Sequence, residues 1–407
     1  MSTSSKTVRP SISDSGDRSR YDPWIVVPAL SLVFCGLLMV ASASLAVSVK
    51  DFGSPFHFFL HQFIYVIIGL GLVAITSKVS LAKWQAWAPF LLLLTALGLV
   101  LVLLPGIGKH INGAKRWIGL GFFHLQVSEF AKLAMMVYIA SYLTRRHDEL
   151  HTSVWGFIKP LLVLGFCALL LLLEPDFGAT TVIVLVTMGM MFLAGAPLQR
   201  FSVLVAIAFL MLASLIYFAP YRVERVLNFL DPWNNAFNGG YQLTQALMAF
   251  GRGGLFGVGL GNSVQKLFYL PEAHTDFLFA VIGEELGFFG CMVVVSLYVV
   301  LIARILYLGR RCLRQDSWFA AYLSYGLALW LAAQSFINIG VNIGILPTKG
   351  LTLPFISYGG SSLLVSSIAL GLLLRIAQEA KNPSTPTFST SHASPRSPRK
   401  RRPKRRT

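Results

Sequence analysis

About ten apolar runs, each long enough to cross a lipid bilayer as a helix, dominate this sequence and restrict the folds open to it. Of its 407 residues, 55% are hydrophobic and only 13% are charged, whereas roughly a quarter of the residues in a soluble domain carry charge. We therefore predict an all-α polytopic membrane protein with about ten spans. The expected spans lie near residues 24–48, 58–76, 84–104, 126–144, 157–173, 177–195, 200–219, 278–304, 318–344 and 354–376.

The distribution of positive charge predicts how these spans are oriented. Both tails and the loops expected on their side hold 24 of the 34 Lys and Arg residues, and the loops on the other side hold nine. By the positive-inside rule both termini are cytoplasmic, as basic disordered tails at 1–23 and 381–407 around a membrane domain at 24–380. The net charge of +17 then reflects membrane topology and anionic lipid heads, so we expect no nucleic-acid partner.

This orientation assigns four polar segments to the outer face, near residues 105–125, 174–176, 220–276 and 345–353. The large extracytoplasmic loop, at about 220–276 between spans seven and eight, is rich in glycine and amides toward its end. Lipid cannot satisfy free backbone groups, so a polar loop at this depth must line a water-accessible cavity. Such a cavity beside a bilayer is where we expect chemistry on a lipid-borne substrate.

Asp276 is the candidate catalytic residue because it stands where the eighth span begins, beside Phe277 and Phe279. Apolar surroundings should raise the pKa of its carboxyl toward the range of a general base. The alternative is a simple helix start, in which Thr275 is the N-cap and the helix dipole favours the acid.

Several charged or titratable residues on the same side are candidates for substrate binding. Outer cations could face an anionic leaving group, or they could pair with neighbouring acids. Glu272 and His274 are close to Asp276 in sequence and could assist it or serve only as polar loop groups. The full set of candidate substrate-binding residues is Lys115, Arg116, Arg222, Arg225, Lys266, Lys349, Glu272 and His274.

Six further ionisable residues are expected to have structural or relay roles: Glu129, Lys132, Glu174, Asp176, Glu284 and Glu285. The first two are three residues apart and should pair on one helix face. The last two lie two turns into the eighth span, where carboxylates could relay protons or fix the helix. The middle two flank a proline at a break, where they could position a polar network or form half of a divalent-cation site, although their spacing is too loose to assign a metal.

Five motifs in and around these segments resemble the SEDS family of bacterial peptidoglycan polymerases, and the resemblance extends over about residues 24–380. They are NGAKRWI (112–118), SEFAKL (128–133), EPDFGATTVI (174–183), LPEAHTDFLFAVIGEELG (270–287) and FINIGVNIGILPTKGLTLPFISYGGSS (336–362). The segment SVQKLFYLPEAHTDF and the basic tails are more similar to the cell-division branch than to the elongation branch. Val127 stands where the family commonly has proline, which alters the entry to the fourth span but removes no ionisable group.

The resemblance implies a glycosyltransferase that joins the disaccharide-pentapeptide units of lipid II into glycan strands during septal cell-wall synthesis. The aspartate of the HTDF motif, Asp276 here, is regarded as catalytic in the family. An α-linked donor that gives a β-linked product requires one inverting displacement, for which one general base is enough. A retaining glycosidase would instead need two close carboxylates.

The resemblance also implies partners and a location. The partners are a class B penicillin-binding protein with transpeptidase activity and other membrane proteins of the division complex, in the inner membrane at the septum. No cofactor is assigned, and a divalent Mg²⁺ or Mn²⁺ ion stays open. Three other functions also stay open: a lipid II flippase, a non-catalytic scaffold and an elongation-type polymerase. A flippase needs access from both faces, yet the polar motifs gather on one side, and a scaffold would not explain their chemistry.

Overall fold

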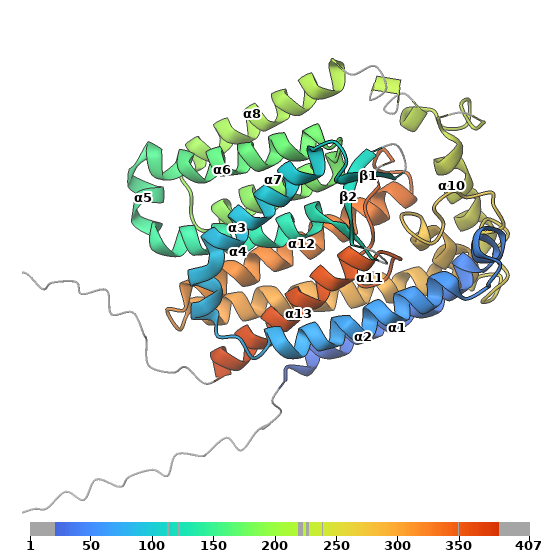
Figure 1. Cartoon of the computed structure of the whole chain (residues 1–407), viewed down its shortest axis with the longest axis horizontal. Helices are drawn as coiled ribbons and strands as arrows, with labels where there is room; N and C mark the ends of the chain where they lie inside the picture. The colour runs from blue at the N-terminus through green and yellow to red at the C-terminus, as the bar shows by residue number, and fades with distance from the viewer. Residues whose placement is uncertain are drawn as a thin grey trace, which may run out of the picture.

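The computed structural model describes residues 21–111, 114–120, 123–218, 223–224, 228–237, 239–348 and 350–381. Within these ranges the chain is a bundle of long helices with one small sheet (Figure 1). The long helices are α1 (Pro23–Phe52), α2 (His57–Thr76), α3 (Leu81–Leu103), α4 (Val127–Arg145), α6 (Val154–Leu173), α7 (Phe177–Leu193), α8 (Leu198–Tyr217), α11 (Leu278–Leu313), α12 (Trp318–Asn342) and α13 (Gly360–Lys381). Two shorter helices are α5 (His147–Thr152) and α10 (Tyr241–Gly253).

Each range expected to span the membrane coincides with one long helix. Among the described residues, seven helices are long and apolar enough to cross a bilayer: α1, α2, α3, α6, α11, α12 and α13. The chain is therefore a multi-pass helical membrane protein, and the exact number of ten spans stays a prediction. The last helix begins later than expected, at Gly360 rather than near 354, because residues 354–359 form turns in which Phe355 has a φ of 66°.

The ends of α1 show how local sequence sets the helix boundaries. Asp22 accepts a hydrogen bond from the Trp24 N–H (3.1 Å), and Pro23 occupies the first helical position, where no N–H is needed. Arg304 of α11 donates two hydrogen bonds to the other oxygen of Asp22 (3.0 and 2.8 Å). At the far end Gly53, with a φ of 67°, closes the helix by donating to the carbonyl four residues earlier.

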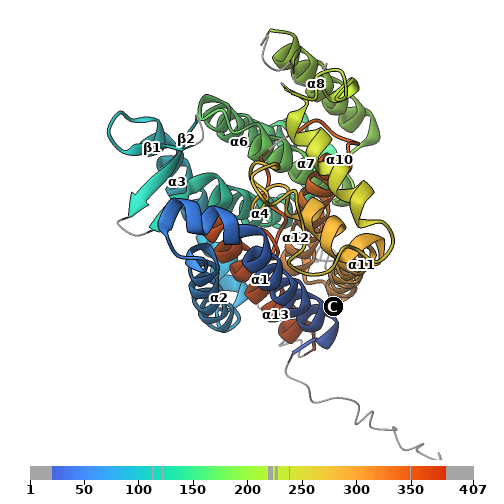
Figure 2. The ribbon, with the colours of Figure 1, turned by 90° about the vertical axis from the view of Figure 1, so that its right-hand side faces the viewer.

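The helices form a buried centre and a lipid-exposed outer layer. Most of α12 and α13 is buried, and α12 packs against α11, α7 and α4 while α13 packs against α2. By contrast α2 and α3 are mostly exposed and carry large apolar side chains outward, as expected for surfaces that face lipid. Helix α8 contacts α7 near its start, where the ring centroids of Phe201 and Phe192 are 5.0 Å apart, and diverges from the bundle toward its other end (Figures 1 and 2).

A three-stranded antiparallel sheet replaces the loop expected at 105–125. Its strands are β1 (Gly108–Ile111), β2 (Ala114–Leu120) and β3 (Phe123–Gln126), in the order β1-β2-β3. Trp117 of β2 pairs with Gln126, the last residue before α4, so the sheet is continuous with that helix. The sheet and α10 lie at one end of the bundle, on the right in Figure 1, and α5 lies at the opposite end.

Candidate functional site

Asp276 lies at the end of the bundle that carries the sheet and α10, two residues before α11 begins. Its side chain is half-buried, and no described residue donates a hydrogen bond to its carboxyl. The alternative in which Thr275 caps the helix is wrong. The N-cap is Phe277, which offers no side-chain acceptor, and the Thr275 hydroxyl donates instead to Glu272 Oε2 (2.7 Å).

Two asparagines of α12 hold the backbone around this carboxyl. The Asp276 carbonyl accepts hydrogen bonds from Asn338 Nδ2 (2.9 Å) and Asn342 Nδ2 (3.0 Å). Asn338 Nδ2 also donates to the Leu351 carbonyl (2.6 Å). Next to Leu351, Gly350 lies so close that a Cβ there would be 3.0 Å from Asp276 Oδ2. The segment 350–353 thus forms one wall of the site.

Burial, followed by the neighbouring charge of Glu272, raises the pKa of Asp276 from 3.8 to about 7. Asp176 raises this pKa further, and Arg116 opposes the rise. A carboxyl with a pKa near neutral can accept a proton and release it again at physiological pH. Asp276 therefore has the protonation behaviour of a general base.

Arg116 connects the sheet to the break between α6 and α7. Its Nε donates to the Glu174 carbonyl (3.3 Å), and its Nη2 donates to the Pro175 carbonyl. Lys115, its half-buried neighbour on β2, points to the other face of the sheet because successive side chains on a strand alternate. Of these two candidate cations, Arg116 is the one that faces the carboxyls of the site.

The two acids at the α6–α7 break differ in their surroundings. Asp176 caps α7, and one of its oxygens accepts from Ser128 Oγ (2.8 Å) and Gln126 Nε2 (3.3 Å). Glu174 is fully buried, and neither of its carboxylate oxygens has a hydrogen-bond partner among the described residues. Burial and the charge of Asp176 raise the pKa of Glu174 to about 8, while Arg116 lowers it. Glu174 therefore carries a proton at neutral pH.

Among the described residues, no group of three or more His, Cys, Asp or Glu side chains is arranged to hold a metal ion. The proposal of a divalent Mg²⁺ or Mn²⁺ ion therefore stays a hypothesis, and the pair at the α6–α7 break is its remaining basis.

The His274 side chain packs against neighbouring aromatic rings and stabilises the loop that precedes α11. Its ring is buried against Phe58 and Tyr358, with ring centroids 4.6 and 5.6 Å away, and its carbonyl accepts the Tyr358 N–H (3.0 Å). Burial lowers the pKa of His274, so the ring is neutral near pH 7. Glu272 has a φ of 56° and turns the chain back toward α11.

Lys266, Glu284 and Glu285 fasten the preceding loop to α11. Lys266 Nζ lies 2.7 Å from Glu285 Oε1, with 6% and 0% of the two side chains exposed, and Ser42 of α1 donates to the same carboxylate (2.7 Å). Glu284 accepts from the backbone N–H groups of residues 264 and 265 (3.0 and 3.3 Å) and from Arg252 (3.4 Å). These contacts favour an anchoring role for Lys266 over the substrate contact expected from the sequence.

Helix α11 breaks at Gly287, where φ is 69°, and the loop completes its hydrogen bonds. The N–H groups of Val258 and Gly259 donate to the carbonyls of Glu284 and Glu285 (both 3.0 Å). A Cβ at Gly287 would lie 2.3 Å from the backbone nitrogen of residue 257, so the close approach requires glycine.

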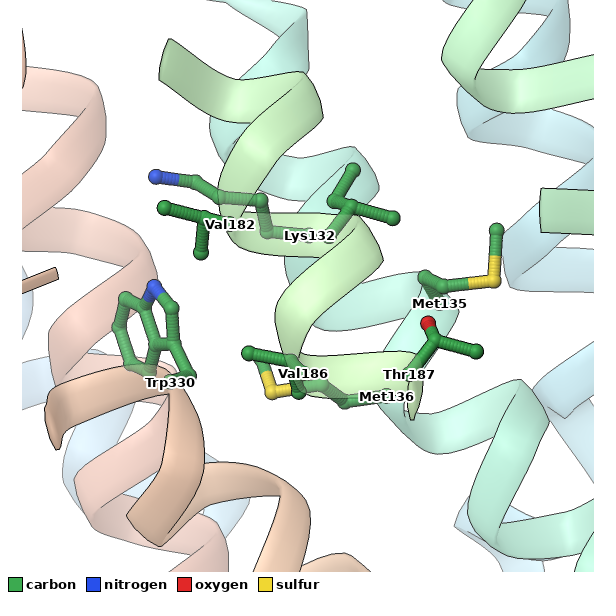
Figure 3. A pocket seen from close by; sticks show the side chains of 8 residues that line it. Lys132, Met135, Met136, Val182, Val186, Thr187 and Trp330 are labelled. Carbon is green, nitrogen blue, oxygen red and sulfur yellow. The ribbon is translucent and has the colours of Figure 1, made fainter. Parts of the chain in front are cut away.

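The expected pairing of Glu129 with Lys132 is present deep in the bundle, with 2.8 Å between Nζ and Oε1. Lys132 also donates to Gln334 Oε1 of α12 (2.8 Å), which accepts the Trp330 indole N–H (2.7 Å). Figure 3 shows the nitrogen ends of Lys132 and Trp330 on the same side of a gap between α4, α7 and α12. Gln334 Nε2 donates to the Thr352 carbonyl (3.0 Å), which connects this pair to the wall of the site.

Three predicted substrate-binding residues, Lys349, Arg222 and Arg225, lie outside the described residues. Sequence reasoning also missed Gly350, which approaches the Asp276 carboxyl, and four polar residues that the fold brings to the site: Gln126, Ser128, Asn338 and Asn342. The two asparagines had a readable signal, because they occur four residues apart in FINIGVNIGILP on an otherwise apolar helix.

The chain is similar to proteins of known family over most of its length. Residues 23–382 match the family of cell cycle proteins that comprises FtsW, RodA and SpoVE. A protein of Coxiella burnetii named probable peptidoglycan glycosyltransferase FtsW is 54% identical over 362 residues, which cover 89% of this chain and 97% of that protein. A Legionella pneumophila protein of the same name is 50% identical over 361 residues, covering 89% and 92%.

Two solved structures have the same fold. A chain from a peptidoglycan synthase complex, studied for its coordination of polymerization and crosslinking, matches with a TM-score of 0.75 and 30% identity over 89% of this chain and 99% of that chain. The rod shape determining protein RodA of Thermus thermophilus matches with a TM-score of 0.65 and 28% identity over 88% and 97%.

Proposed function

Because this chain belongs to the FtsW/RodA/SpoVE family of cell cycle proteins, we propose that it is a peptidoglycan glycosyltransferase whose general base is Asp276. Its substrate is lipid II, and its product is a glycan strand. The observation that carries the assignment of the base is the half-buried carboxyl of Asp276, whose pKa is about 7. A purely scaffolding role would not require such a group.

The reaction is a single inverting displacement. The acceptor sugar hydroxyl loses its proton to the Asp276 carboxylate while its oxygen bonds to the anomeric carbon of the donor. The bond from that carbon to the diphosphate oxygen breaks, and the undecaprenyl diphosphate leaves with the electron pair. The ionised carboxylate must lie within hydrogen-bond reach of the hydroxyl, and none of the described residues occupies that position with a hydrogen-bond donor.

Arg116 is the described cation best placed to stabilise the leaving diphosphate. Two of its nitrogens bind the carbonyls at the α6–α7 break, and a guanidinium has five N–H donors in all, so donors remain for a phosphate oxygen. Lys115 is a further candidate, as are Lys349, Arg222 and Arg225, which lie outside the described residues.

The protein acts in the inner membrane at the division septum, with both termini in the cytoplasm, beside a class B penicillin-binding protein. The similarity to a chain of a peptidoglycan synthase complex supports the transpeptidase partner. The division role is favoured over elongation by the FtsW relatives at 50–54% identity, compared with 28% for RodA.

The test is polymerisation of lipid II by purified protein together with its transpeptidase, with divalent metal added or chelated. Asp276→Ala and Asp276→Asn should abolish polymer while the protein still folds and binds lipid II. Asp231→Asn is the matched control, since this acid is exposed in the same connection and, among the described residues, its carboxylate accepts hydrogen bonds only from Asn234. Polymer formed at the normal rate by either Asp276 variant would reject this residue as the base.

A further inference from the structure

We propose that Asn338 and Asn342 of α12 are positioning residues that fix the Asp276 carboxyl relative to the acceptor sugar, an inference that rests on the proposed function. Neither amide touches the carboxyl itself. Both donate to the Asp276 carbonyl, at 2.9 and 3.0 Å, and so hold the backbone from which the carboxyl extends. They lie four residues apart and therefore on one face of α12.

Asn342 also replaces a missing helix cap. At the third position of α11 the Ala280 N–H points out of the helix end, where an N-cap side chain would normally accept it. The N-cap residue, Phe277, has no side-chain acceptor, and the Ala280 N–H is shared between the Phe277 carbonyl and Asn342 Oδ1 (both 3.0 Å). One amide thus binds the chain on both sides of the N-cap, which fixes the direction in which α11 starts.

Asn338 sets the opposite wall of the site. Its Nδ2 bridges the Asp276 and Leu351 carbonyls, which brings residue 350 to the carboxyl. A Cβ on Gly350 would lie only 3.0 Å from Asp276 Oδ2, so small movements of this bridge change the space beside the carboxyl. Gln334, one turn earlier on α12, holds the next carbonyl, that of Thr352 (3.0 Å). Gln334 and Asn338 thus hold the segment 350–353, and Asn338 and Asn342 hold the backbone of Asp276, which fixes the position of this wall relative to the base.

Both asparagines are almost completely buried, at 2% and 0% exposed. Water therefore cannot readily replace a lost amide. Removal of Asn338 takes the amide donor from the Leu351 carbonyl, and removal of one asparagine leaves the Asp276 carbonyl with one of its two side-chain donors. The backbone would then shift to find other partners. A displacement of about 1 Å can reduce the rate of a positioned reaction about 100-fold, so the effect should appear in kcat more than in KM.

Two variants separate positioning from folding. Asn338→Ala removes both donated bonds. Asn342→Asp keeps an acceptor for the Ala280 N–H but loses one of the two side-chain donors to the Asp276 carbonyl, so it retains the cap while loosening the backbone that carries the base. Ser335→Ala is the control on the same helix, because the buried Ser335 hydroxyl bonds only to carbonyls of its own helix.

The measurement is kcat, KM for lipid II and the pH–rate profile, with lipid II binding and thermal unfolding as checks of the fold. Both asparagine variants should lose about 100-fold in kcat with KM nearly unchanged, and Ser335→Ala should match wild type. In Asn342→Asp the acid limb of the profile should also move to higher pH, because the added carboxylate disfavours ionisation of Asp276. The limb shift reports that position 342 lies near Asp276, whereas a residue that acted only through stability would not lower kcat at an unchanged KM in protein that is still folded.

Wild-type kcat and an unshifted acid limb in Asn342→Asp would overturn the proposal, whatever Asn338→Ala does. If Asn338→Ala does not fold, the Asn342→Asp result decides alone. Normal polymerisation by Asp276→Asn would instead reject the base itself, so failure of the proposed function is distinguishable from failure of the positioning role.

Discussion

The environment of Asp276 predicts that two substitutions move the acid limb of the pH–rate profile in opposite directions. Glu272 raises the pKa of Asp276 and Arg116 lowers it. Glu272→Gln should therefore shift the limb to lower pH, and Arg116→Gln should shift it to higher pH. With a pKa of about 7, about a tenth of the carboxyls are ionised at pH 6, so wild type should there reach about a tenth of its plateau rate.

The assay is kcat/KM for lipid II polymerisation between about pH 5 and pH 9, since this ratio reports the pKa of the free enzyme. Only the position of the limb is compared, because Arg116→Gln also weakens contact with the leaving group. Glu174→Gln serves as a control for the other carboxyl that titrates near neutrality, with a pKa of about 8, and should leave the limb in place. A wild-type rate that is flat from pH 6 to 8, or shifts of the same sign in the two variants, would refute the reasoning.

Three further substitutions test the packing around the site. Lys266→Met should destabilise the protein by roughly 3–5 kcal/mol because it leaves the Glu285 carboxylate buried without its cation, and adding Glu285→Gln should recover most of the loss. Thermal unfolding in detergent measures both variants, and a Lys266→Met variant as stable as wild type would contradict the ion pair. Gly350→Ala should lower kcat with little change in unfolding temperature, since its Cβ would crowd Asp276 Oδ2 at 3.0 Å; unchanged kcat would show that the carboxyl can move aside. Gly36→Ala should cost about 1–3 kcal/mol of stability, because its Cβ would lie 2.6 Å from a backbone oxygen of the segment before α13; wild-type unfolding would contradict that close contact.

The helices could be predicted from the sequence because each apolar run is longer than a soluble strand or helix usually is and must satisfy its own backbone in lipid. Pairing within one helix was equally readable: the spacing of Glu129 and Lys132 fixes their approach before any tertiary structure forms. The sheet at 108–126 was missed because its strands are short and carry no sustained alternation of apolar and polar residues.

Contacts between distant segments could not be predicted in the same way. The ion pair of Lys266 with Glu285 depends on how the loop returns to α11, and the sequence shows only a lysine and a carboxylate 19 residues apart. The asparagine contacts to Asp276 cross 62 and 66 residues, so they follow from the packing of α12 against α11. For Asp276 itself, the position at a helix start could be predicted, whereas its contacts with Asn338 and Asn342 could not.

The break at Gly287 makes the shape of α11 dependent on the loop at residues 258–259. A straight helix would use the carbonyls of Glu284 and Glu285 for its own ladder, but here the loop occupies them. The helix can straighten only if the loop releases these carbonyls, so undocking of the loop and straightening of the helix are coupled changes. A macromolecule that binds the docked and the undocked loop with different affinities would shift the equilibrium between the bent and the straight helix by that difference in binding free energy. A partner that contacts only this loop could thereby change the shape of a membrane helix.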